Sequence, residues 1–225
     1  GYMNGSRYYG EDLPINTWYM KRFAGLSEDG LSLWYYTDKE TNEEKTTTTY
    51  STGDFYLCGD PNPDLYGGFG TSITFHGFDL STQFSYLVGG LTYDYGYAGM
   101  MGNPTATSVG NRWHKDVLKA WSPENPSSTI PRWHFNDLNT TGSSDRFLID
   151  GSYLNLQNIQ VGYTLPDSWT SHLKIKNLRL YFVCDNVYYW SKRKGLDPRR
   201  SISGVGTSGK IAPFRTYSGG ISLQF

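Results

Sequence analysis

LYGGFGTSITF (65–75), HG (76–77) and FDLSTQFSYLV (78–88) form the stretch of sequence that decides the fold class of this chain. Apolar residues favour odd positions before the HG pair and even positions after it. This period of two is the pattern of a strand with one apolar and one polar face. A two-residue turn at His76-Gly77 places Phe75 opposite Phe78 and brings the two apolar faces to the same side, as a tight hairpin requires. The stretch therefore predicts a β-hairpin.

The hairpin also predicts which side chains share a face, because successive side chains of a strand point to opposite sides. The apolar face is expected to carry Phe69, Ile73, Phe75, Phe78, Leu80 and Phe84. The polar face is expected to carry Ser72, Thr74, Asp79, Ser81 and Gln83.

The composition restricts the classes of partner and of membrane structure. The 20 Lys and Arg residues nearly balance the 21 Asp and Glu residues, and this balance gives no reason to expect a nucleic acid as a partner. Aromatic residues make up 16% of the chain, a content that favours strands over helices. No apolar run approaches the roughly 20 residues of a membrane-spanning helix. A β-barrel is the other way to cross a membrane, and it needs only alternating strands of about 10 residues.

Period-two patterning recurs along the chain and predicts an all-β, antiparallel fold. Within one expected strand the apolar positions change from even to odd around Gln157-Asn158. A β-bulge is the usual cause of such a change; a strand that leaves the membrane partway along is the alternative. The expected strands lie near Tyr153–Leu165, at about Leu173–Tyr189, at Arg215–Phe225, and at Thr17–Ala24 and Leu31–Tyr36 around an Asp29-Gly30 turn.

The connections between the strands differ in length. Those at residues 76–77 and 166–172 are short, and those at 93–146 and 191–214 are long. Outer-membrane barrels have this asymmetry, with short periplasmic turns and long extracellular loops. In one long connection, four apolar residues at helical spacing predict a short helix packed on the loop. These residues are Trp113, Val117, Leu118 and Trp121.

The final eight residues, SGGISLQF (218–225), resemble the C-terminal assembly signal of outer-membrane barrels. That signal has a polar residue, then glycine, then a hydrophobic residue, and ends on an aromatic residue. Ser218, Gly220, Leu223 and Phe225 match its spacing. An edge strand of this kind suits pairing with the assembly machinery before a barrel closes.

A wider set of short stretches resembles the SusC/RagA family of TonB-dependent transporters, in order and spacing along nearly the whole chain. The stretches are YMKRFAGL (19–26), CGDPNP (58–63) with GGF (67–69), KAWSPENP (119–126) with IPR (130–132), YLNLQNI (153–159), GYTLP (162–166), DNV (185–187) and GLDP (195–198). The resemblance implies a transmembrane β-barrel of 22 strands in the outer membrane of a Gram-negative bacterium. It also implies an N-terminal plug, a segment that contacts TonB, and a SusD-like surface lipoprotein that captures substrate.

The resemblance assigns residues 1–225 to the C-terminal part of that barrel, with the plug domain and the TonB-contacting segment outside this sequence. The six or seven strands expected here are fewer than the 8 of the smallest usual barrel. The chain is therefore expected to need the rest of the barrel and the lipid around it. The resemblance implies nutrient import, with a glycan or an oligopeptide as substrate.

Catalytic and metal-binding patterns do not emerge from the sequence. It contains no GxSxG motif, and its four His residues lie far apart. We therefore expect no enzyme activity, no metal and no cofactor. The two cysteines, Cys58 and Cys184, are distant and unmatched, and are expected to stay unbridged.

The candidate binding residues each have two interpretations. Trp113, Trp121 and Trp133 crowd one extracellular loop, where they would stack on sugar rings or pack the loop against itself or the capping lipoprotein; packing is favoured. Arg179 and Asp185 alternate with apolar positions and are expected to face the lumen. There they would line a solute path or pair with plug or wall residues, and pairing is favoured.

Two rival readings remain. A soluble, aromatic-rich β-sandwich that binds carbohydrate would share the composition and the loop aromatics. It would not need short and long connections at opposite ends, or the signal that ends at Phe225. A small complete barrel with a structural role is disfavoured by the strand count.

Overall fold

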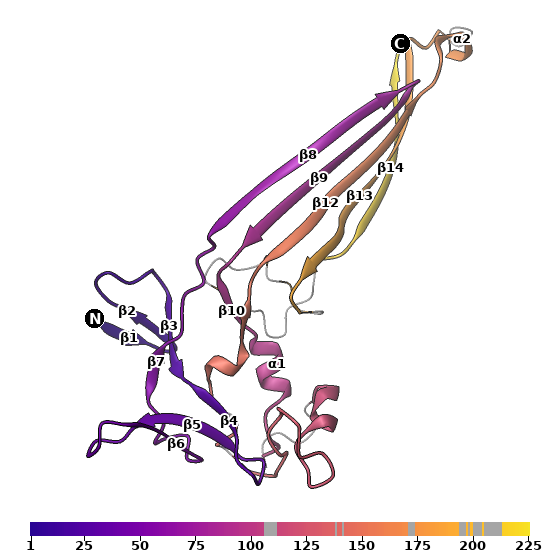
Figure 1. Cartoon of the computed structure of the whole chain (residues 1–225). Coiled ribbons are helices and arrows are strands. Elements are labelled where there is room, and N and C mark those ends of the chain that lie inside the picture. The colour runs from indigo at the N-terminus through magenta and orange to yellow at the C-terminus, as the bar shows by residue number, and fades with distance from the viewer. Residues whose placement is uncertain are drawn as a thin grey trace. The chain divides into compact units, whose positions relative to one another are not determined.

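The computed structural model describes residues 1–105, 112–137, 139–140, 142–170, 174–193, 197, 199, 204 and 213–225 (Figure 1). The chain divides into two compact units, each assembled from three segments. Unit 1 comprises residues 1–62, 90–150 and 198–209, and unit 2 comprises 63–89, 151–197 and 210–225.

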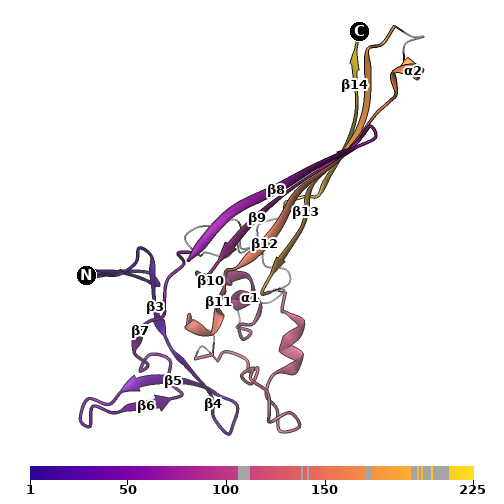
Figure 2. The same ribbon diagram turned by 45° about the horizontal axis from the view of Figure 1, so that its top comes forward.

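Unit 2 is built on a five-stranded antiparallel sheet with the order β14-β13-β12-β9-β8. Its strands run side by side in one twisted layer in both ribbon views (Figures 1 and 2). Their lengths of 9 to 15 residues reach or exceed the roughly 9–11 residues with which a tilted strand crosses a bilayer. The strands are β8 (Leu65–Phe75), β9 (Phe78–Val88), β12 (Tyr153–Thr164), β13 (Asn177–Ser191) and β14 (Thr216–Gln224).

The hairpin of β8 and β9 confirms the prediction from the sequence. Phe75 lies opposite Phe78, and the register continues without a shift to the pair Leu65 and Val88. The turn residues His76 and Gly77 have φ angles of 47° and 86°. Positive φ at both central residues is the geometry of a type I′ turn, whose twist matches that of the two strands.

The phase change in β12 is a β-bulge, as the sequence indicates. Between Leu156 and Asn158 the register of β12 shifts against both of its neighbours. β9 passes directly from Gln83 to Phe84 at this level, whereas β12 contains one additional residue, Gln157. β13 contains two residues there, 186 and 187, because Leu156 pairs with position 188 and Asn158 with position 185.

The fourth expected strand begins later than predicted. β13 starts at Asn177 rather than at Leu173, which lies outside the described residues. The preceding connection is not a simple turn, because it contains the four-residue helix α2 (Asp167–Thr170). Lys174, with φ of 58°, lies between this helix and the strand. Such a backbone conformation ends a regular element, which explains the later start.

Unit 1 consists of short strands in small sheets. One sheet has the order β1-β2-β3-β7, a second β4-β5-β6, and a third pairs β10 with β11. The bounds are β1 (Tyr2–Asn4), β2 (Arg7–Tyr9), β3 (Thr17–Lys21), β4 (Phe23–Leu26), β5 (Ser32–Thr37), β6 (Glu44–Thr47), β7 (Phe55–Leu57), β10 (Leu91–Tyr93) and β11 (Leu148–Asp150).

The two strands expected at the start of the chain exist, but they do not extend the long sheet. The segment Thr17–Ala24 is divided at Arg22 into β3 and β4, which belong to different sheets. β4 pairs with β5 around a turn in which Gly30 has φ of 73°. Within the described residues the long sheet therefore has five strands, not six or seven.

The helices of unit 1 lie in the long connection between β10 and β11. They are α1 (Tyr95–Met100), which the sequence analysis missed, and the short 3₁₀ segments η1 (Lys115–Lys119) and η2 (Asp145–Phe147). η1 confirms the expected short helix, but its apolar residues do not share a buried face. Val117 packs on the core, whereas Leu118 is 90% exposed. The tighter turn of a 3₁₀ helix rotates neighbouring positions away from the spacing that an α-helix would give.

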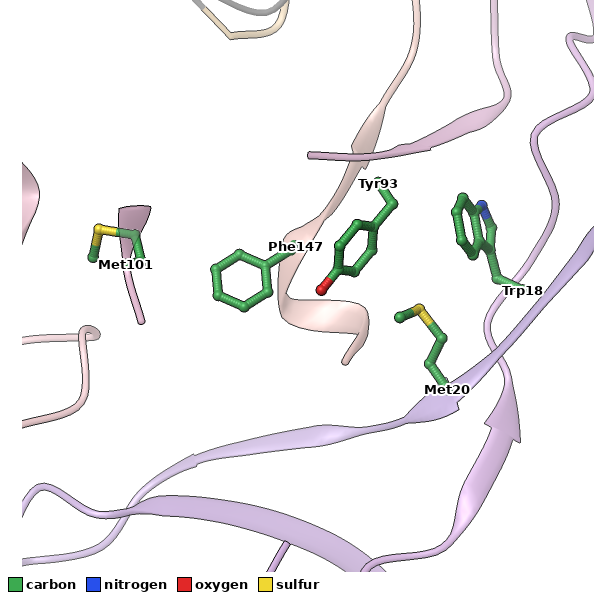
Figure 3. Packing of buried hydrophobic residues seen from close by; sticks show 5 residues of the cluster. All are labelled: Trp18, Met20, Tyr93, Met101 and Phe147. Carbon is green, nitrogen blue, oxygen red and sulfur yellow. The ribbon is translucent and has the colours of Figure 1, made fainter. Parts of the chain in front are cut away.

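The core of unit 1 is aromatic and rich in methionine (Figure 3). Tyr93 lies between Trp18 and Phe147, with ring centroids 5.8 Å and 6.1 Å away. Met20 and Met101 complete the buried cluster. The Trp18 indole N–H donates to the carbonyl oxygen of residue 91, which ties β3 to β10.

Candidate functional site

The long sheet of unit 2 has one apolar and one polar face. Its apolar face lies open: Phe69, Ile73, Phe75 and Phe78 are each more than half exposed. The register places Ile73 opposite Leu80 and Phe75 opposite Phe78. Phe69 stacks on Phe84 with ring centroids 4.8 Å apart. Apolar area left uncovered on this scale marks a surface that contacts lipid or another protein.

Aromatic residues gather toward both ends of this apolar face. Near the His76-Gly77 turn, Tyr163 packs on Phe78 with ring centroids 4.4 Å apart. Toward the other end, Tyr188 packs against Trp190 at 4.9 Å. The aliphatic residues Ile73, Leu80 and Val161 lie between the two ends, together with the stacked pair Phe182 and Tyr217. An apolar strand face with aromatic residues toward both ends is typical of a wall that spans a bilayer.

The polar face carries hydroxyl and amide groups. A shallow hollow in the middle of the sheet is lined by Gly70, Thr71, Ser72, Ser81, Thr82, Gln83 and Asn158. The Asn158 side-chain amide donates to the Asp185 carboxylate at 2.7 Å. Asp185 is therefore held by a neighbouring strand.

Arg179 is paired within the wall. Its Nε donates to Asp79 Oδ1 at 2.9 Å, and its Nη2 donates to Oδ2 at 2.5 Å. The two residues lie on β13 and β9, the strands that flank β12, and Gly162 of β12 leaves the space between them. A Cβ atom on Gly162 would lie 2.4 Å from the carboxylate and 2.5 Å from the guanidinium. Asp79 is the partner that the sequence analysis did not assign to Arg179, since the pairing is visible only once the strand order is known.

The four residues that match the assembly signal lie at the edge of the sheet. β14 pairs with β13 on one side, and its other side has no strand partner among the described residues. Leu223 and Phe225 fall on the apolar-face positions with Ile221, and Ser218 and Gly220 fall on the polar-face positions. Leu223 lies opposite Leu178, and Phe225 is 73% exposed.

The three loop tryptophans divide into a pair and a single residue. Trp113 and Trp133 pack edge to face at 5.5 Å, and both indole N–H groups point to the carbonyl oxygen of Gly102, at 3.1 Å and 3.4 Å. Trp121 packs closely over Gly30. The first set of contacts packs the loop on itself, and Trp121 packs it on the turn between β4 and β5. Trp133 keeps 42% of its surface exposed.

Several charged groups of unit 1 are buried, and the sequence did not single them out. Lys21 is 5% exposed, and its ammonium donates to the carbonyl oxygens of Tyr50, Ser51 and Gly53 at 2.6, 3.1 and 2.7 Å. Burial lowers the pKa of Lys21. The three backbone carbonyl groups and the nearby Tyr50 ring stabilise this charge, and the charge of Asp54 opposes the effect of burial on the pKa.

Asp145 and Cys58 have pKa values that burial shifts upward. Burial raises the pKa of Asp145, although the Phe23 backbone N–H donates to its carboxylate at 2.8 Å. Burial also raises the pKa of the Cys58 thiol to about 11. A thiol with such a pKa is mostly protonated at neutral pH and reacts slowly.

Metal ligands and membrane-spanning helices are absent from the part of the chain that the structure describes. No three His, Cys, Asp or Glu residues there lie close enough together to hold a metal ion. None of its helices has the length and apolar character needed to cross a membrane. His114 instead lies beside Asp116, with Nδ1 and Oδ2 3.1 Å apart.

Comparison with known proteins shows similarity along the whole chain. It is 29% identical, over an alignment of 235 positions, to TonB-dependent receptor P3 of Formosa agariphila; the alignment covers all of this chain and 22% of that protein. It is 27% identical to TonB-dependent receptor SusC of Bacteroides thetaiotaomicron, over 79% of this chain and 17% of that receptor. The chain thus spans about a fifth of the length of these relatives, both of which are named as TonB-dependent receptors. No family model matches the chain.

Solved structures show the same fold. The RagAB peptide importer in its "open-open" state aligns with a TM-score of 0.79 and 26% identity, over all of this chain and 24% of that chain. The "closed-closed" state of the same importer gives a TM-score of 0.77. These alignments confirm the all-β, antiparallel fold class and the expected SusC/RagA-like character of the chain.

Proposed function

We propose that this SusC/RagA-like chain is the C-terminal part of the barrel of a TonB-dependent nutrient importer in the outer membrane of a Gram-negative bacterium. The observation that carries the proposal is the whole-length similarity to TonB-dependent receptors and to a peptide importer. The whole protein would contain the plug domain and the TonB-contacting segment in its N-terminal part.

The two-faced sheet supports a place in a membrane wall. Its open apolar face suits lipid, and its polar face suits a water-filled lumen. Both edge strands, β8 and β14, have an unpaired side within the described residues. Unpaired backbone groups cost several kcal/mol each in hydrocarbon, so the rest of the barrel must pair with these edges.

The work of the whole importer would be uptake of a glycan or an oligopeptide with a SusD-like surface lipoprotein as partner. Similarity to receptor SusC and to the RagAB peptide importer supports these two substrate classes. The barrel would supply a gated path, and TonB would supply the energy through the missing part. No covalent chemistry is required of this chain.

The sandwich alternative is not favoured. A β-sandwich buries the apolar face of each sheet against a second sheet, about 10 Å away. Here the apolar face of the long sheet stays open, with Ile73 at 57% and Ile221 at 65% exposure.

Transport by the full-length protein in its native cell envelope tests the proposal. Deletion of the gene should abolish uptake of either a labelled oligopeptide mixture or a labelled neutral oligosaccharide mixture, and removal of TonB should have the same effect. The protein should stay in the outer-membrane fraction after a carbonate wash. Recovery in the soluble fraction, or unchanged uptake of both mixtures, contradicts the proposal.

A further inference from the structure

A continuous line of side chains crosses four strands on the polar face of unit 2. It begins at Asp79 on β9 and passes over Gly162 of β12 to Arg179 on β13. The Arg179 guanidinium carbon lies 5.3 Å from the centre of the Tyr181 ring, two residues along the same strand. The Tyr181 ring in turn lies over Gly220, its direct partner on β14.

The contact between Tyr181 and Gly220 leaves no room for a side chain at position 220. A Cβ atom there would lie 2.4 Å from the Tyr181 ring carbon Cζ and 2.4 Å from its hydroxyl oxygen. The ring has an obstacle to moving aside, because Arg179 lies next to it and is held by Asp79. The neighbouring Gly219 is different, since the nearest atom to its Cβ would be the Tyr181 carbonyl oxygen at 3.9 Å.

Alternation alone does not determine the register of the terminal strand. A slip of one residue between β13 and β14 would exchange the faces of every side chain, and is therefore excluded. A slip of two residues preserves the faces, so the apolar and polar pattern tolerates it. The polar-face positions of β14 are Thr216, Ser218, Gly220, Ser222 and Gln224.

We propose that Gly220 leaves the space in which the Tyr181 ring packs, and that this packing contact sets the register of the terminal strand. Gly220 is the one polar-face position of β14 without a side chain. A slip of two residues in either direction would place Ser218 or Ser222 beneath the ring, where its Cβ has no space. Gly220 is thus a positioning residue within the wall. This role is separate from import and from recognition of the chain end by the assembly machinery.

Four variants of the full-length protein test the packing of the Tyr181 ring over Gly220. They are Gly220→Ala, Gly219→Ala as the matched control, Tyr181→Ser, and the double variant Tyr181→Ser/Gly220→Ala. The fraction that migrates as a folded, heat-modifiable barrel is measured in the outer membrane. Gly220→Ala should lower this fraction several-fold, and Gly219→Ala should leave it unchanged. In the Tyr181→Ser background, Gly220→Ala should have no further effect, because the ring that excludes the methyl group is gone.

Register is read directly by crosslinking in the full-length protein, with its native cysteines replaced by serine. Cysteines at Val183 and Ser218, which lie opposite each other, should crosslink in the parent protein. Cysteines at Val183 and Thr216 leave Gly220 intact and should crosslink only after a slip of two residues, and the Tyr181→Ser background should increase this product.

The outcomes that overturn the proposal are specific. Equal losses of the folded fraction for Gly219→Ala and Gly220→Ala, or no loss for either, would show that the contact between Tyr181 and Gly220 does not set the register. A loss for Gly220→Ala that persists in the Tyr181→Ser background would assign the glycine to recognition by the assembly machinery instead. If Tyr181→Ser itself folds poorly, Tyr181→Thr provides a second background. The folded fractions with and without Gly220→Ala are then compared within that background, and equal fractions support the proposal.

Discussion

Asp79 and Arg179 form a bidentate ion pair across the strand that lies between them, and the shorter contact, between Arg179 Nη2 and Asp79 Oδ2, is 2.5 Å. Each side chain keeps about a quarter of its surface exposed. The pair therefore lies between an exposed ion pair, worth about 0.2–1 kcal/mol, and a buried pair, whose disruption costs about 3–5 kcal/mol.

The first prediction follows from this geometry. Asp79→Asn should lower the free energy of unfolding by about 2 kcal/mol, because it leaves the guanidinium without its counter-charge. Arg179→Lys should lower the free energy of unfolding by a smaller amount, since it keeps the positive charge but loses the bidentate hydrogen bonding of the guanidinium. The midpoint of heat modifiability of the full-length protein measures both. A double variant, Asp79→Asn/Arg179→Gln, should lose less than the sum of the single changes.

The second prediction concerns the two faces of the hairpin. Leu80→Arg should destabilise the barrel by roughly 2–4 kcal/mol if position 80 lies near the bilayer midplane. Ser81→Arg, one residue away on the polar face, is the matched control and should be tolerated. Spin labels at Ile73 and Ser72 give an independent measure. A label at Ile73 that escapes lipid-soluble quenchers while one at Ser72 is quenched would reverse our assignment of the faces.

The third prediction is a pH dependence from Asp145. Its folded-state pKa is raised by burial, so this carboxyl group contributes stability that is fully present below its unfolded pKa of 3.8 and is lost as the pH rises through the raised value. Asp145→Asn keeps an acceptor for the Phe23 N–H and removes the partly buried charge. The variant should therefore be at least as stable as the parent at pH 7, and its stability should no longer fall over that pH window. Hydrogen exchange of the Phe23 amide across this range measures the effect, and an unchanged pH profile would count against it.

The fourth prediction concerns the cysteines. Both thiols should be free in the oxidised protein, and peptide mass mapping after alkylation of the denatured protein should show Cys58 and Cys184 both modified. Cys58 should react slowly with a thiol reagent in the folded protein at pH 8, because burial raises its pKa to about 11. The denatured chain is the control and should react rapidly. A mass that corresponds to one intramolecular disulfide would contradict this expectation.

The fifth prediction concerns Phe225. We expect this side chain at the periplasmic interface, where aromatic residues anchor barrel strands. Deletion of Phe225 or Phe225→Asp should lower the amount of folded barrel in the outer membrane, and Phe225→Trp or Phe225→Tyr should be tolerated. Substrate affinity of the folded fraction should not change. Assembly of the aspartate variant at parent levels would mean that the match to the assembly signal is a coincidence of composition.

Local pattern was enough to predict much of the long sheet. The hairpin register, the turn and the bulge at Gln157 each follow from alternation within one or two neighbouring strands. Turn chemistry and face matching are local, so they can be read without knowledge of the rest of the fold.

The remaining features depend on contacts between distant residues. The pairing of Asp79 with Arg179 requires the order β9-β12-β13, which no local pattern encodes. The division of Thr17–Ala24 into β3 and β4 depends on two separate sheets, and the burial of Lys21 depends on three carbonyl groups about 30 residues away. The exposed Leu118 was predicted to pack because α-helical spacing was assumed for what is a 3₁₀ segment.

The successive bulges at the level of Gln157 have a mechanical consequence. Between the same two rungs of the ladder, β9 has no intervening residue, β12 has one and β13 has two. Each extra residue adds roughly 3.3 Å of contour length if extended, so β13 is longer than β12, and β12 longer than β9, between these positions. A bulge accommodates such a difference by leaving the extra residue unpaired, bending the strand and increasing its twist, and Asn186, with φ of 52°, is one of the extra residues of β13. The difference in residue number between neighbouring strands therefore favours a bend in this part of the wall, independently of the strands that complete the barrel.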